Sequence, residues 1–78
     1  SKKAKKEINK IISKLDEKLA KKAKLFLKDF QSASDSWERR VYKNRLLNLL
    51  CREGRAYLNP SDKKICKYIK GLLDALEK

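Results

Sequence analysis

Residues 51–66 read CREGRAYLNPSDKKIC, and this stretch decides the fold because it separates two apolar helical patterns. It contains the only two cysteines of the chain, Cys51 and Cys66, together with the only proline. If the flanking helices are antiparallel, both cysteines lie at similar distances from the turn between them, and Cys66 borders an apolar stripe. We therefore predict a Cys51–Cys66 disulfide that joins the two helices, the alternative being two free cysteines in a cytosolic core.

The length of the chain, 78 residues, makes such a covalent link valuable. A domain of this size buries only about 60% of the surface that its unfolded chain exposes, so it needs a cross-link such as a disulfide for stability. Closing a loop of about 15 residues contributes roughly 3 kcal/mol in the chain-entropy model. Because disulfides persist in oxidising compartments, the link predicts a secreted, extracellular protein.

The segments around this stretch have the spacing of amphipathic helices. A last helix is expected at about residues 60–76, where Asn59 and Pro60 form a start signal, and Gly71 within it is expected to allow a close helix approach. A middle helix is expected at about residues 36–53, capped by Asp35.

The first helix is expected to be long, at about residues 3–32, because neither glycine nor proline interrupts its apolar stripe. We expect three aromatic residues in the core, namely Phe26, Phe30 and Trp37. The prediction is an all-α, single-domain, three-helix bundle over residues 1–78, with a long N-terminal amphipathic helix.

Net charge is the strongest functional signal in the sequence. The chain has 22 Lys and Arg residues against 10 Asp and Glu residues, a formal charge of +12. Such an excess favours polyanionic partners, which include heparin-like glycans and nucleic acid. The simpler interpretation of the lysine-rich first helix is a solvated face. Our candidate binding residues are Lys10, Lys14, Lys21, Lys24, Arg39, Arg40, Arg52, Arg55 and Tyr57.

Catalysis, metal binding and cofactor binding have no support in the sequence. Histidine is absent, which removes the usual general base and the usual zinc ligand. Two cysteines do not complete a zinc site, and no glycine-rich phosphate loop is present. We expect a non-enzymatic binding protein without a metal or cofactor.

One stretch resembles a known family. The stretch reads Leu49-Leu50-Cys51-Arg52-Glu53-Gly54-Arg55-Ala56-Tyr57-Leu58-Asn59, followed by Lys63-Lys64-Ile65-Cys66. It is similar to the C-terminal helical domain of mosquito salivary proteins of the aegyptin, or 30 kDa antigen, family. These proteins join an acidic, glycine-rich half to a cysteine-containing half, bind collagen and inhibit platelet adhesion and aggregation. The resemblance implies that this chain is the C-terminal part of a longer secreted protein, although the acidic half is not in it.

The resemblance makes interference with host haemostasis, through a host macromolecule such as collagen, the first functional expectation. Polyanion binding in its own right is the second, and an acidic segment of the parent chain is a further candidate partner. A membrane-active antimicrobial peptide is the third, although packing of the apolar face within a bundle argues against a membrane partner. The fourth is a carrier that holds a small acidic lipid between its helices.

Overall fold

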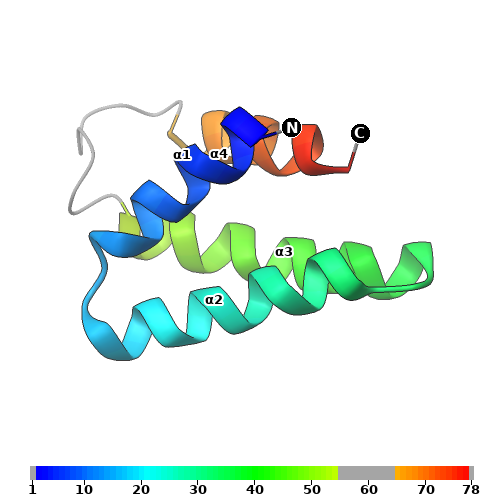
Figure 1. Ribbon diagram of the computed structural model, residues 1–78, viewed down its shortest axis with the longest axis horizontal. Coiled ribbons are helices and arrows are strands. Elements are labelled where there is room, and N and C mark those ends of the chain that lie inside the picture. Colours follow the sequence, from blue (N-terminus) through cyan, green and yellow to red (C-terminus); the bar gives the residue numbers. More distant parts are fainter. Residues whose placement is uncertain (1, 55–64, 78) are drawn as a thin grey trace.

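The computed structural model describes residues 2–54 and 65–77, and these residues form four helices without a strand. They are α1 (Lys2–Ser13), α2 (Glu17–Ser32), α3 (Ser36–Gly54) and α4 (Ile65–Leu76). α2 and α3 form a hairpin, α4 packs along α3, and α1 closes over α4 and the hairpin (Figure 1). The all-α prediction is confirmed, but the prediction of three helices is wrong.

The difference lies at residues 14–16, where the expected long first helix breaks into α1 and α2. The backbone of Asp16 is extended, and its side chain accepts a hydrogen bond from the backbone N–H of Leu19 at 2.9 Å. It is therefore the N-cap of α2. Tight turns end α1, since the N–H groups of Lys14 and Leu15 donate to carbonyls three residues earlier.

The break has a packing advantage that the sequence spacing does not reveal. A straight helix over residues 3–32 would extend roughly 45 Å at 1.5 Å per residue, too far for both halves to reach one small core. With the turn, Ile8 and Ile12 of α1 and Ala23 of α2 all become fully buried. Leu15, in the turn itself, is also buried.

A single core holds the four helices together. Its largest fully buried side chains come from α1, α3 and α4: Ile8, Ile12, Leu46, Leu50, Ile69 and Leu73. α2 adds Leu27 and Phe30. Burying each large aliphatic side chain is worth about 1.5–3 kcal/mol relative to exposure.

The predicted link between α3 and α4 is present. Cys51 of α3 and Cys66 of α4 form a disulfide with a Cα–Cα distance of 5.0 Å, inside the range of roughly 4.4–6.8 Å that disulfides require. α3 agrees closely with the expected 36–53. The described part of the last helix begins at Ile65, and the expected start at Asn59 and Pro60 lies outside the described residues.

Two side-chain expectations need correction. Phe30 is buried and Phe26 packs against the core, but the side chain of Trp37 is 75% exposed. Trp37 precedes the buried Leu46 by nine residues, which at about 100° per residue places it on the opposite face of α3. Gly71 faces open space, since a Cβ there would meet no atom within 4 Å, so it makes no close helix approach.

Candidate anion-binding surface

The four lysine candidates, which the sequence places on one long first helix, are distributed over α1, the following turn and α2, and the two helices run in different directions (Figure 1). Lys10 belongs to α1 and Lys14 to the following turn, whereas Lys21 and Lys24 belong to α2, and all four are exposed. The turn at Asp16 separates the two pairs. The structure therefore does not assemble these candidates into one straight binding surface.

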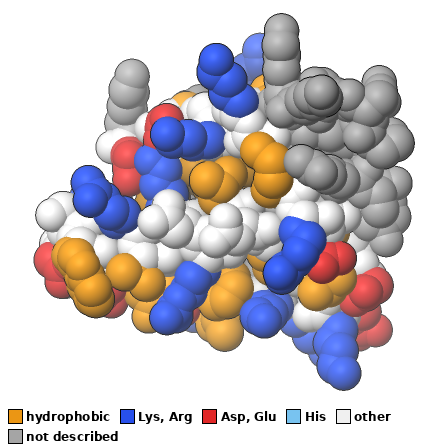
Figure 2. Space-filling model, turned by 180° about the vertical axis from the view of Figure 1, so that it is seen from behind, with side chains coloured by type: hydrophobic (Ala, Val, Ile, Leu, Met, Phe, Trp, Pro, Cys, Tyr) orange, Lys and Arg blue, Asp and Glu red, His pale blue; other side chains and the backbone are white. Residues whose placement is uncertain are grey.

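α2 presents its own basic face to solvent. Lysines 18, 21, 22, 24 and 28 are exposed, and among them lies Leu25, whose side chain is 56% exposed. Viewed from behind, the molecule shows basic side chains scattered among exposed hydrophobic ones (Figure 2). Glu17 lies 3.7 Å from Lys21, but both side chains are largely exposed, so this pair contributes little.

The solvent-facing side of α3 differs from that of α2 because it carries arginine and amide side chains. At about 100° per residue, six of its exposed residues fall within an arc of about 140°. We call this surface the arginine face; its members are Trp37, Arg40, Asn44, Arg45, Asn48 and Arg52. No Asp or Glu of α3 lies within the arc. Arg40 and Arg52 were predicted as binding residues, and their separation of twelve positions corresponds to about 18 Å at 1.5 Å per residue.

Two contacts orient guanidinium groups on this face. The Arg45 guanidinium lies 5.6 Å from the centre of the Tyr42 ring, a cation–π distance. The Arg52 Nε lies 3.4 Å from the Glu53 carboxylate. Arg40 has no such contact among the described residues, so its donors remain available to a ligand.

Arg39 belongs to a different side of α3. It is half-buried, and its Nη2 donates to the carbonyl of Ala33 at 3.3 Å. This bond ties the start of α3 to the residue that ends α2, since Ala33 is the C-cap of α2. Arg39 therefore combines a structural role with a position near the surface.

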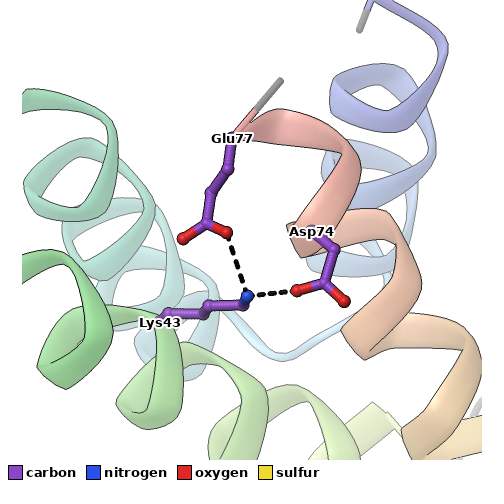
Figure 3. A network of polar contacts seen from close by, with 3 residues as sticks. All are labelled: Lys43, Asp74 and Glu77. Atoms are coloured by element: carbon purple, nitrogen blue, oxygen red, sulfur yellow. Dashed lines mark hydrogen bonds and ion pairs between the residues drawn. The ribbon is translucent and has the colours of Figure 1, made fainter. Parts of the chain in front are cut away.

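Beside Arg39, one lysine joins α3 to the end of α4. The Lys43 ammonium donates to the carboxylates of Asp74 and Glu77, the latter at 3.2 Å (Figure 3). The Lys43 side chain is only 15% exposed. Burial by itself lowers the pKa of Lys43, but the two hydrogen bonds and the two negative charges outweigh it, so this pKa is raised above its ordinary value.

These residues surround a hollow of about 340 Å³ at the junction of α3 and α4. Its lining residues are Ser36, Arg39, Arg40, Lys43 and Glu77. The first four are spaced i, i+3, i+4 and i+7, so they share one side of α3. A neighbouring hollow of similar size also has Arg39 and Glu77 in its wall. Three cationic side chains and one hydroxyl thus line the hollow together with a single carboxylate. The positive charges outnumber the negative one, which suits the hollow to an anionic group.

Three residues of this hollow were missed by the sequence prediction, namely Ser36, Lys43 and Glu77. Their spacing on α3 was visible, but the position of α4 against that side was not. The candidates Arg55 and Tyr57 lie outside the described residues.

The described part of the chain contains neither a metal site nor a membrane-spanning helix. Within residues 2–54 and 65–77, no group of three or more His, Cys, Asp or Glu side chains is arranged to hold a metal ion. None of the helices there has the length and apolar character to cross a membrane.

No protein-family model, curated protein or solved structure matches the chain. Charge and geometry therefore carry the functional proposal.

Proposed function

We propose that this protein is a secreted, non-enzymatic helical domain that binds polyanionic polymers through the arginine face of α3. The observation that carries the proposal is the absence of acidic residues from this face, in a chain of net charge +12. Guanidinium groups present planar, bidentate donors that match sulfate and phosphate groups.

The positions of the acidic residues support this proposal. Asp16 and Asp35 cap helices, and Asp74 and Glu77 hold Lys43. Asp16, Asp35 and Asp74 are engaged away from the arginine face, whereas Glu77 lines a hollow beside Arg40 and Glu53 contacts Arg52. The basic excess is therefore left facing solvent, where it attracts counterions that a polyanion would release on binding.

The dimensions favour a polymer over a small anion. The arginines of the face span about 18 Å, which exceeds the screening length of about 8 Å at physiological ionic strength. One small anion therefore interacts strongly with only part of the face. A chain of regularly spaced anionic groups interacts with all of it.

The disulfide supports the extracellular part of the proposal. It closes the connection between α3 and α4, and structural disulfides are typical of proteins from oxidising compartments.

A salt titration tests the proposal. Binding to heparin and to a DNA fragment is measured between 50 and 500 mM NaCl for the wild type and for the triple variant Arg40→Ala, Arg45→Ala, Arg52→Ala. We expect the triple variant to lose at least roughly tenfold in affinity and to show a smaller salt dependence, since fewer counterions are released.

The matched control is Lys18→Ala, Lys22→Ala, Lys28→Ala, which removes the same charge from the exposed face of α2. Equal losses in the two triple variants would show that total charge, and not the arginine face, determines binding. Absence of binding by the wild type at 50 mM NaCl would refute polyanion binding altogether.

A second candidate follows from the resemblance to the salivary family. We propose it because the stretch that carries the resemblance includes both cysteines of the disulfide. In that case the domain binds collagen and inhibits platelet aggregation. Collagen binding that persists at high salt would favour this candidate. Loss of collagen binding in the triple arginine variant would instead show that collagen binds to the arginine face, as the polyanion does.

A further inference from the structure

The hollow between α3 and α4 has one feature that the arginine face lacks, since a carboxylate of the chain itself forms part of its wall. The Glu77 carboxylate lies 3.2 Å from the Lys43 ammonium and lines the same hollow as Arg39 and Arg40. This carboxylate therefore engages Lys43, one of the three cations that an external anionic group in the hollow would contact. Figure 3 shows Glu77 reaching Lys43 from beyond the end of α4.

Glu77 can leave this position without disturbing the lysine. Asp74 also accepts a hydrogen bond from the Lys43 ammonium, so Lys43 stays oriented when the Glu77 side chain rotates away. The Glu77 backbone is held by its N–H bond to the Asp74 carbonyl at 3.1 Å, which leaves the side chain as the moving part. The Glu77 side chain is 34% exposed, and ion pairs that solvent reaches contribute little to stability.

When the Glu77 side chain rotates away, the hydrogen-bond donors that remain around the hollow suit a tetrahedral oxyanion. The bond from Arg39 to the Ala33 carbonyl uses one of its five N–H donors. Arg40 is exposed and can present its planar fork, while Ser36 supplies a hydroxyl. Charge-assisted bonds from such groups to an oxyanion are about twice as strong as neutral ones.

We propose that this hollow binds one sulfate group of a sulfated glycan and that Glu77 competes with the sulfate for the same cations. The inference rests on the proposed polyanion-binding function and adds the class of polymer and a specific contact. A sulfate ester projects from its sugar and ends in free oxygens, so it can enter a walled hollow. A nucleic-acid phosphate is esterified on both sides within the backbone, which fits an open groove better.

The test compares two substitutions that change the net charge equally. Glu77→Gln removes the competing charge from the hollow. Glu7→Gln removes a charge from α1, which contributes no residue to the hollow or to the arginine face. We measure the affinity of each full-length variant for a heparin oligosaccharide, for its desulfated counterpart and for single-stranded DNA of similar length, at fixed ionic strength. Circular dichroism verifies that each variant is folded.

We expect Glu77→Gln to bind the heparin oligosaccharide about fivefold more tightly than Glu7→Gln does, without a matching gain for DNA. Arg40→Lys, which keeps the charge but loses the fork, should lower the heparin affinity of the Glu77→Gln protein several-fold. The desulfated oligosaccharide should show no gain.

The alternative outcomes are distinct from one another. Equal heparin affinities of the two Gln variants, with binding retained, would overturn the site but leave the proposed function intact. An equal gain for DNA would overturn the assignment to glycans. Loss of polymer binding in all proteins would overturn both.

If Glu77→Gln does not fold, inorganic sulfate is titrated into the wild type against chloride at equal ionic strength. We then expect saturable changes in the NMR signals of the Arg39 and Arg40 side chains. Linear, non-saturating changes would refute the site.

Discussion

The Asp16 carboxylate accepts a hydrogen bond from the Leu19 N–H at 2.9 Å, and this contact marks the point where one expected helix becomes two. It allows α1 to turn back over α4 while α2 pairs with α3. The position of the basic residues of both helices depends on it.

Asp16→Ala should therefore destabilise the protein by about 1 kcal/mol, the usual cost of losing an N-cap. The measurement is chemical denaturation monitored by circular dichroism. Asp16→Asn is the control, because Asn keeps an acceptor and should retain most of the stability. An Ala variant as stable as the wild type would mean that packing alone positions the turn.

Removal of the Cys51–Cys66 disulfide should have a larger effect. The chain-entropy model gives a loss of about 3 kcal/mol for a loop of about 15 residues. At about 4–8 °C per kcal/mol for a domain of this size, Tm should fall by roughly 12–24 °C in the Cys51→Ala, Cys66→Ala variant. An unchanged Tm would show that the core holds α3 and α4 together without the link.

Gly71→Ala should stabilise the protein by about 0.5–1 kcal/mol. Gly71 is helical without a positive φ, and an added Cβ would meet no atom within 4 Å. Alanine lowers the entropy of the unfolded chain and favours the helix. Thermal denaturation checks this expectation. A decrease in Tm would instead indicate a close contact at this position.

The Lys43 network should give a pH-dependent contribution to stability. The pKa of Lys43 is raised in the folded state by Asp74 and Glu77 despite burial. Its contribution is therefore complete below the ordinary lysine pKa of about 10.4 and is lost as the pH rises through the higher folded pKa.

Lys43→Met should lower the free energy of unfolding by about 1 kcal/mol near pH 8, less than the roughly 1.5–3 kcal/mol of a hydrogen bond to a charged group because solvent reaches the Asp74 and Glu77 carboxylates. The difference from the wild type should shrink above about pH 10.4. Lys70→Met, at an exposed position on α4, is the control and should show neither effect. A Lys43 effect independent of pH would show that the methylene chain, not the charge, stabilises the contact.

Much of the fold was predictable because it depends on local signals. The Asp35 cap is confirmed by a 2.7 Å bond from the Glu38 N–H, and α3 begins directly after it. The disulfide was predictable because its two positions flank one connection. The turn at residues 14–16 was not, because the apolar spacing from Ile11 to Leu19 fits a continuous helix equally well.

The candidate site was only partly predictable, for a related reason. Arg40 and Arg52 were identified from charge, and their exposure on one face of α3 follows from helix geometry. Trp37 was predicted in the core because aromatic residues at helical spacing are usually buried, although its distance of nine residues from Leu46 places it on the other side. Lys43 and Glu77 come together through the packing of α4 on α3, a tertiary contact that sequence spacing alone does not specify.

The most direct test of the central claim is the heparin affinity of the triple variant Arg40→Ala, Arg45→Ala, Arg52→Ala beside that of Lys18→Ala, Lys22→Ala, Lys28→Ala. Both variants lose three positive charges, so total charge cannot distinguish them. Binding through the arginine face predicts at least a roughly tenfold weaker affinity for the arginine variant and a much smaller loss for the lysine variant. Equal affinities would contradict it.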